Sequence, residues 1–232
     1  PEVKEVASSP RPPRRVDQST IRITAVGHAT FLIQMDGVNI LTDPIWSQRC
    51  SPVSWAGPKR HHPPGLSWED LPPIDLVLIS HNHYDHLDLP TLKNLALRDT
   101  PEALVPLGNR ELVSKTGIKQ VEELDWWESV SLGSRITITM VPAQHFSGRT
   151  PWDRNRTLWA GYIISGASGR VYFAGDTAYG PHIREIGEKF SPITVALLPI
   201  SPFRTGKTND PTPSRFSRVH MNPKEAVQAH LD

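Results

Sequence analysis

The stretch SHNHYDHLD, residues 80–88, places three histidines and an aspartate within six consecutive positions. It follows a nearly continuous apolar run, IDLVLIS, which predicts a strand buried on both faces. In an extended segment residues two apart point the same way, so His81, His83 and Asp85 can face one cavity, while the turn into a following helix brings His86 to a neighbouring position. These are more ligands than one catalytic zinc with an open position needs. The pattern therefore predicts two metal ions.

Strands and helices are predicted on both sides of this stretch. Short runs rich in β-branched and aliphatic residues predict strands at IRITAV (21–26), TFLIQM (30–35), VNILTD (38–43), RITITMVPA (135–143), TLWAGYIIS (157–165), RVYFAGD (170–176) and ITVALLPI (193–200), the last of them buried. Helices are predicted over LPTLKNLAL (89–97), NRELVSKTG (109–117), PHIREIGEKF (181–190) and PKEAVQAHL (223–231). This order indicates two sheets packed together with helices outside.

Composition limits the classes of function. With 232 residues, 38% of them hydrophobic and 21% charged, the chain is expected to form one soluble globular domain. A net charge of +1 provides no field for a polyanion, so we expect no nucleic-acid partner. The single cysteine, Cys50, fits a cytoplasmic protein, with an oxidising compartment as the alternative. The chain does not start with Met, so loss of an N-terminal signal stays open, and the sequence does not determine the oligomeric state.

Residues 1–20 are polar, proline-rich and basic, and they lack an apolar period, so we expect a flexible N-terminal arm ahead of a domain over residues 21–232. The cluster RPPRR (11–15) is either solvated or in peripheral contact with an anionic membrane surface.

Further metal ligands are expected at the ends of other predicted strands. His145 follows TITMVPA, Asp176 follows VYFAG, and His220 stands just before the last predicted helix. Together with the 81–86 cluster they would complete two sites in which a carboxylate and a water lie between ions about 3.5 to 4 Å apart. His28 in GHAT and Asp43 in LTDP are candidates for orienting the ligands through hydrogen bonds, with an ordinary structural role as the alternative.

The segments GHATFLI, LTDPI, ISHNHYDHLD, LDWWE, PAQHFSGRT, LWAGY, FAGDTAY and VHMNPKEAV resemble the metallo-β-lactamase fold superfamily, and within it the branch of the N-acylphosphatidylethanolamine-hydrolysing phospholipases D and the ascorbate-phosphate lactonases. Several look closer to the phospholipase. The resemblance implies an α+β fold, a four-layer αββα sandwich. It also implies a last strand and helix with a His-Trp-Gly segment, which we expect this chain to lack because it ends at Asp232.

The resemblance implies a ligand set of seven residues: His81, His83 and His145 on one metal, Asp85, His86 and His220 on the other, and Asp176 between them. Zinc suits these nitrogen and oxygen donors, and iron or manganese would fit comparable positions. The expected reaction is hydrolysis of a phosphodiester by a hydroxide that both metals share. The first candidate substrate is an N-acylphosphatidylethanolamine-type phospholipid. Asp85 and Asp176 would be the catalytic carboxylates.

Several alternatives stay open. The same ligands would serve a metallo-lactonase or another hydrolase of sugar phosphates or nucleotides, because specificity depends on the surrounding loops. The fold could also persist as a binding module without ions. Tyr84 faces either the substrate head group or solvent. Four tryptophans line either an acyl-chain groove or the core: Trp126, Trp127, Trp152 and Trp159. Four further histidines are expected at the surface and away from the metals: His61, His62, His182 and His230.

Overall fold

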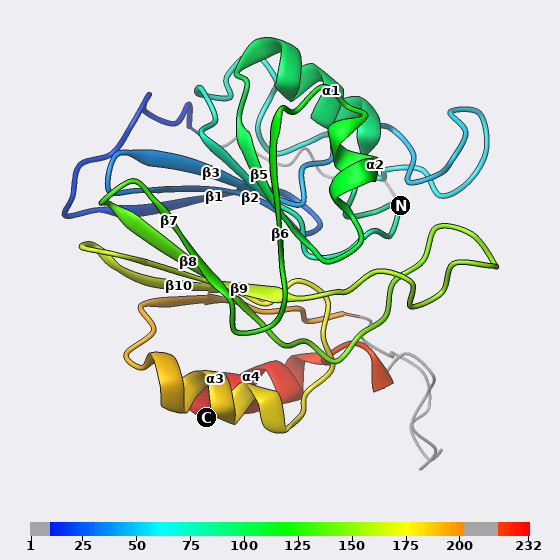
Figure 1. Ribbon diagram of the computed structural model, residues 1–232. Helices are drawn as coiled ribbons and strands as arrows, with labels where there is room; N and C mark the ends of the chain where they lie inside the picture. Colours follow the sequence, from blue (N-terminus) through cyan, green and yellow to red (C-terminus); the bar gives the residue numbers. More distant parts are fainter. Residues whose placement is uncertain (1–9, 202–217) are drawn as a thin grey trace.

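The computed structural model describes residues 10–201 and 218–232, in which two β-sheets pack face to face (Figure 1). The first sheet has its strands in chain order: β1 (Ile21–Gly27), β2 (Thr30–Met35), β3 (Val38–Thr42), β4 (Leu76–Leu78), β5 (Glu102–Pro106) and β6 (Gln120–Leu124). Strands β1 to β3 are antiparallel, and β3 to β6 are parallel.

The second sheet has the order β11-β10-β9-β8-β7. Its strands are β7 (Ser129–Leu132), β8 (Ile136–Val141), β9 (Gly161–Gly166), β10 (Gly169–Phe173) and β11 (Val195–Leu197). Pairing is antiparallel from β7 to β10 and parallel between β10 and β11.

Helices cover the outer face of each sheet. α1 (Leu89–Arg98) and α2 (Arg110–Ser114) lie on the first sheet, and α3 (Pro181–Phe190) and α4 (Pro223–Leu231) lie on the second (Figure 1). The predicted αββα layering is therefore confirmed. No helix in the described parts of the chain is long and apolar enough to cross a membrane.

The central core lies between the two sheets. Ile33 and Leu78 from the first sheet meet Tyr162 and Phe173 from the second, all at most 1% exposed. Strand β4 is buried at every position because sheet neighbours flank it and packed layers cover both faces. The prediction that IDLVLIS contains a strand buried on both faces is thus confirmed, although the strand covers only Leu76–Leu78.

The polar residues of interest leave the sheets at the carboxyl ends of strands. Asp43 follows β3, the 80–88 stretch follows β4, and His145 and Asp176 follow β8 and β10. Because parallel strands end at the same edge of a sheet, β3 and β4 deliver Asp43 and the histidines side by side. At α4, the Asn222 side chain accepts hydrogen bonds from two backbone N–H groups of the first turn and so begins the helix two residues after His220.

One predicted element differs from expectation. The run ITVALLPI was expected to form a buried strand, but β11 is short and only half-buried, because it is the edge strand of the second sheet within the described residues.

The N-terminal arm stays a prediction, since residues 1–9 lie outside the described residues. In the remaining part of it, the Pro13 carbonyl accepts a hydrogen bond from Gln34, and Arg15 pairs with Asp75.

Candidate metal centre

The 80–88 stretch has no regular secondary structure up to Asn82 and then forms a tight turn over residues 83–86. The His83 carbonyl accepts hydrogen bonds from the backbone N–H of His86 at 3.1 Å and of Leu87 at 2.9 Å. This turn reverses the chain direction, so His86 points back beside His81, with 4.2 Å between the ring centroids. A turn was expected only at His86, but it already includes Asp85, which therefore lies with His86 and His28 and not with His81 and His83.

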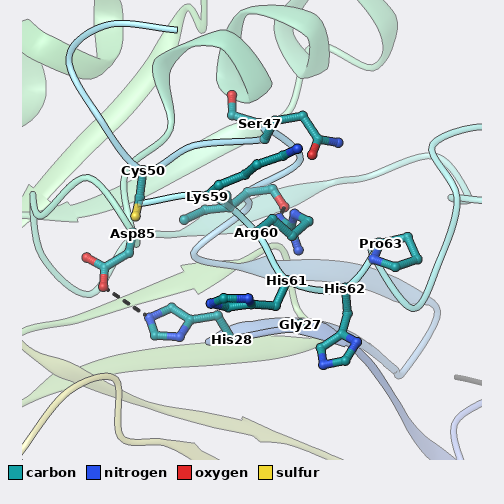
Figure 2. Close-up of a pocket in the computed structure, with 12 residues that line it drawn as sticks. Gly27, His28, Ser47, Cys50, Lys59, Arg60, His61, His62, Pro63 and Asp85 are labelled. Atoms are coloured by element: carbon teal, nitrogen blue, oxygen red, sulfur yellow. Dashed lines mark hydrogen bonds and ion pairs between the residues drawn. The ribbon is translucent and has the colours of Figure 1, made fainter. Parts of the chain in front are cut away.

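Asp85 and His86 lie against a histidine from the turn between β1 and β2. Nε2 of His28 is 3.3 Å from Oδ2 of Asp85 (Figure 2). The same nitrogen is 3.2 Å from Nε2 of His86. His28 sits in the β1–β2 turn with a φ of 50°, and just over half of its side chain is exposed. Burial alone would raise the pKa of Asp85, but contact with His28 and the charge on His86 outweigh it and lower this pKa.

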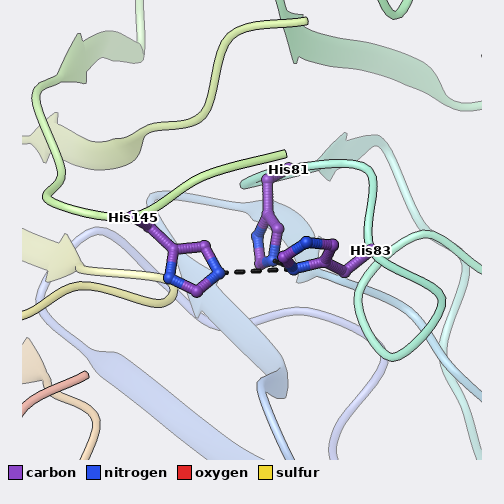
Figure 3. Close-up of side chains that lie close together, drawn as sticks. All are labelled: His81, His83 and His145. Carbon is purple, nitrogen blue, oxygen red and sulfur yellow. Dashed lines mark hydrogen bonds between the residues drawn. The ribbon is translucent and has the colours of Figure 1, made fainter. Parts of the chain in front are cut away.

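Three imidazoles converge on the other side of the turn. Nδ1 of His83 lies 2.7 Å from Nε2 of His81 and 3.3 Å from Nε2 of His145 (Figure 3). His81 and His145 are buried, and burial lowers the pKa of His145 to about 4. At neutral pH the ring of His145 is therefore uncharged, which is the form that binds a cation.

Asp176 lies between the two groups. Its Oδ2 is 3.2 Å from Nε2 of His86 and 3.8 Å from Nε2 of His145. Nε2 of His220 is 3.1 Å from the same oxygen. Burial would raise the pKa of Asp176, but the charge on His86 and the contact with His220 lower it well below its usual value. The carboxylate is therefore ionised and faces imidazoles from both sides.

Hydrogen bonds to the far ring nitrogens orient three of the imidazoles. Nδ1 of His145 lies 2.9 Å from the Val219 carbonyl oxygen, which can only accept, so the lone pair of this ring is on Nε2 and faces the centre. Nδ1 of His86 lies 2.7 Å from Asp43 Oδ2, and Nδ1 of His81 lies 2.9 Å from Ser80 Oγ.

The donor set fits a metal ion. Four groups of three side chains each hold their ligand atoms within 4.8 Å of one another: His81, His83 and His145; His28, Asp85 and His86; His81, His86 and Asp176; and His145, Asp176 and His220. Neutral imidazoles and ionised carboxylates are the donors that zinc, iron and manganese accept in proteins.

The structure brings all seven predicted ligand residues to one place, with one difference in how they group. His220 was expected beside Asp85 and His86, yet it lies with Asp176 and His145, and His28 is the histidine that contacts Asp85. Asp43 has the contacts expected of an orienting residue. The ligand roles themselves stay predictions.

The other predicted residues have varied positions. Tyr84 is half-buried with the Arg149 guanidinium 3.8 Å from its ring centroid. Among the tryptophans, Trp126 and Trp127 pack against the core while Trp152 is 85% exposed. His230 is exposed as expected, but the expectation for His182 was wrong, because its ring is half-buried against Thr177 at 3.0 Å.

Two contributors were missed from the sequence. Ser80 connects His81 to Asp43 through its hydroxyl. Arg149 donates from Nη1 to the carbonyls of Asn82 at 2.8 Å and Leu87 at 2.9 Å, and so holds both ends of the histidine loop. No local pattern marks either role, because both depend on contacts between separate segments.

Comparison with known proteins agrees with this geometry. A 43% identical relative is an uncharacterised protein of Mycobacterium tuberculosis, with 94% of this chain and 56% of the relative aligned. The N-acyl-phosphatidylethanolamine-hydrolyzing phospholipase D 1 of Caenorhabditis elegans is 40% identical over 92% of this chain and 61% of its own length. The chain thus spans little more than half the length of these relatives.

A solved structure of similar fold is Igni18, a metallo hydrolase from the archaeon Ignicoccus hospitalis. It has a TM-score of 0.63 and 24% identity, with 90% of this chain and 76% of the Igni18 chain covered. The model of the β-lactamase superfamily domain matches residues 38–232, which is most of the chain. Relatives of the chain in sequence and in fold include metal-dependent hydrolases. The chain therefore belongs to the family of the β-lactamase superfamily domain.

Proposed function

We propose that the protein is a dinuclear metal hydrolase that cleaves a phosphodiester, with zinc as the first candidate metal and iron or manganese as alternatives. The observation that carries this proposal is the position of Asp176 between two groups of donors, His81 with His83 and His145 on one side and Asp85 with His86 on the other. When bound, two cations would lower the pKa of a shared water towards ~7 and neutralise charge on a phosphate.

The carboxylates would have different tasks. Asp176 would be shared between the cations, because its Oδ2 faces imidazoles of both groups. Asp85 would hold one cation and accept a hydrogen bond from the attacking water, since its pKa is low and it therefore stays an acceptor at neutral pH. His220 would act beside Asp176, the residue it contacts.

A phospholipid is the proposed substrate class, specifically one of the N-acylphosphatidylethanolamine type. A cavity of ≈ 540 Å³ adjoins the centre, with Asp85, Asp176 and His220 among its polar residues. Its apolar wall comes largely from the segment after β11 and from the β-strands: Phe31, Phe173, Leu197, Leu198, Pro199 and Ile200. A polar end beside an apolar wall suits an amphiphile. The four tryptophans do not line this cavity. The phospholipase D of C. elegans adds support as a 40% identical relative.

Tyr84 is proposed to contact the substrate head group, because it lies in the histidine loop and is only half-buried. Such a substrate implies peripheral contact with a membrane. The single cysteine, Cys50, fits a cytoplasmic location.

The test is hydrolysis by metal-loaded protein of an N-acylphosphatidylethanolamine compared directly with a sugar-phosphate lactone. We expect cleavage of the phospholipid, with elemental analysis giving two metal ions per chain. Asp85→Asn and Asp176→Asn should lower turnover by at least about a hundredfold while the fold is retained. Selective cleavage of the lactone would support the alternative, a metallo-lactonase. If elemental analysis finds no stoichiometric metal, the result would support the other alternative, a binding module without ions.

A further inference from the structure

A second cavity adjoins the candidate metal centre and has a different character. It measures ≈ 410 Å³ and shares His28 and Asp85 with the apolar cavity, so the two cavities meet at these residues. Four consecutive basic residues line it: Lys59, Arg60, His61 and His62 (Figure 2). The sequence alone suggested an ordinary solvated loop here, but its basic side chains share a cavity with a predicted metal ligand.

Backbone hydrogen bonds fix the loop in place. The Arg60 N–H donates to the Gln48 carbonyl at 2.8 Å, and the Gly65 N–H donates to the Val26 carbonyl at 2.7 Å. The Cys50 N–H donates to the Pro58 carbonyl at 3.2 Å. The basic segment is therefore anchored on both sides, and the cavity does not depend on ordering a loose loop.

Arg60 is placed to bind a ligand as well as to support the loop. Its Nη2 donates to the Ile45 carbonyl at 2.8 Å, which fixes the guanidinium. Its Nε is buried and has no hydrogen-bond partner among the described residues. The guanidinium also packs against Gly27, where an added Cβ would lie 3.3 Å from Nη1. A buried nitrogen is out of reach of a ligand, so Arg60 contributes to the cavity through the positive charge of its guanidinium and not through Nε.

The charges in this cavity favour an anion. Lys59 and Arg60 are cations at neutral pH, and Asp85 is the one carboxylate that lines the cavity. In the described parts of the chain, the side chains of Lys59, His61 and His62 form no ion pair that would neutralise them. The whole chain carries only +1, so this is a local concentration of positive charge.

We propose that this cavity binds a second phosphate of the substrate, next to the phosphodiester held at the metal centre. A phosphate offers several acceptor oxygens to a guanidinium, an ammonium and the imidazoles. The inference rests on the proposed function and adds a preference to it: among phosphodiesters, those that carry a further phosphate on one of their two alcohols should be cleaved more efficiently than those that do not.

The kinetic test compares two soluble substrates, the p-nitrophenyl phosphodiester of glycerol and the same diester with an additional phosphate on the glycerol. Metal-loaded wild-type protein should prefer the doubly phosphorylated compound in kcat/KM. The double variant Lys59→Gln/His61→Asn should lower that preference about tenfold. Lys93→Gln, an exposed lysine on α1, is the matched control and should retain the preference. An equal loss for both substrates would overturn the proposal.

A binding measurement separates this proposal from the proposed function. Calorimetric titration of the metal-loaded protein with inorganic phosphate should give one more phosphate per chain for the wild type than for the double variant, whether or not any diester is hydrolysed. Equal stoichiometry would overturn the second phosphate site. Failure to hydrolyse either diester, with the difference in stoichiometry intact, would instead count against the proposed reaction. Circular dichroism checks that the exposed substitutions leave the fold unchanged.

Discussion

Asp43 Oδ2 lies 2.7 Å from Nδ1 of His86, and both side chains are fully buried. The same carboxylate accepts hydrogen bonds from the backbone N–H of Ser80 at 2.7 Å and from its hydroxyl at 2.6 Å. Since the Ser80 hydroxyl also contacts Nδ1 of His81, one carboxylate at the end of β3 orients two imidazoles after β4. Burial raises the pKa of Asp43, while contact with His86 opposes this rise.

Asp43→Asn tests this arrangement with little change in shape. Asparagine tolerates the φ of 34° at this position, so the backbone should be unchanged. The substitution removes the negative charge that faces His86. We expect metal affinity to fall about ten- to a hundredfold, because partners of this kind fix the ring orientation of ligands. Metal titration against a competing chelator measures the effect. Asp36→Asn is the control, a buried aspartate at a φ of 50° that bonds Ser168 instead. Equal losses in both variants would contradict a specific role for Asp43.

The sequence predicted those parts of the centre that lie close together in the chain or at strand ends. The 81–86 cluster shows its spacing directly, and His145 and Asp176 follow recognisable strands. The grouping of His220 with Asp176 was not predictable, because it depends on how the segment before α4 crosses the end of β10. Likewise, Lys59 has a local sequence typical of a solvated loop, and only the packing of that loop beside Asp85 gives it a cavity.

Arg149→Met should weaken the metal centre from outside it. The native guanidinium bonds the carbonyls of Asn82 and Leu87 and covers the Tyr84 ring, and methionine retains bulk but no donors. Leaving two carbonyls without this donor should cost about 1–3 kcal/mol of unfolding free energy and lower metal affinity about tenfold. Thermal unfolding and metal titration measure these effects. Arg156→Met, at an exposed arginine nearby, should change neither quantity. If Arg149→Met binds metal as tightly as the wild type, Arg149 does not support the metal centre by holding the histidine loop.

His182 should make stability depend on pH. Burial lowers its pKa to about 4 from the ordinary 6.5. Between these values the unfolded chain binds a proton that the folded chain does not, so stability falls as pH decreases from about 6.5 to about 4. His182→Gln should remove part of this decline, on the order of 1–2 kcal/mol because solvent screens the half-buried ring. Urea unfolding of metal-free protein at several pH values tests it. The exposed His230→Gln serves as control, and identical pH profiles for the two variants would refute the assignment.

Loss of the hydroxyl should change the unfolding free energy differently at two buried tyrosines in neighbouring strands. Tyr162 in β9 donates to the Ile79 carbonyl at 2.7 Å and thereby connects the second sheet to the end of β4. Burial raises the pKa of Tyr162 well above its usual value, so the hydroxyl remains a donor. The Tyr172 hydroxyl in β10 is buried with no hydrogen-bond partner among the described residues.

Tyr162→Phe should therefore lower the unfolding free energy by about 1–3 kcal/mol, because it removes a buried hydrogen bond. Tyr172→Phe should be neutral or slightly stabilising, because the buried hydroxyl it removes gains nothing in the folded state. Urea unfolding at neutral pH measures both. The two side chains have the same volume and similar burial, so packing cannot account for a difference. Equal destabilisation would contradict a stabilising role for the hydrogen bond between the Tyr162 hydroxyl and the Ile79 carbonyl.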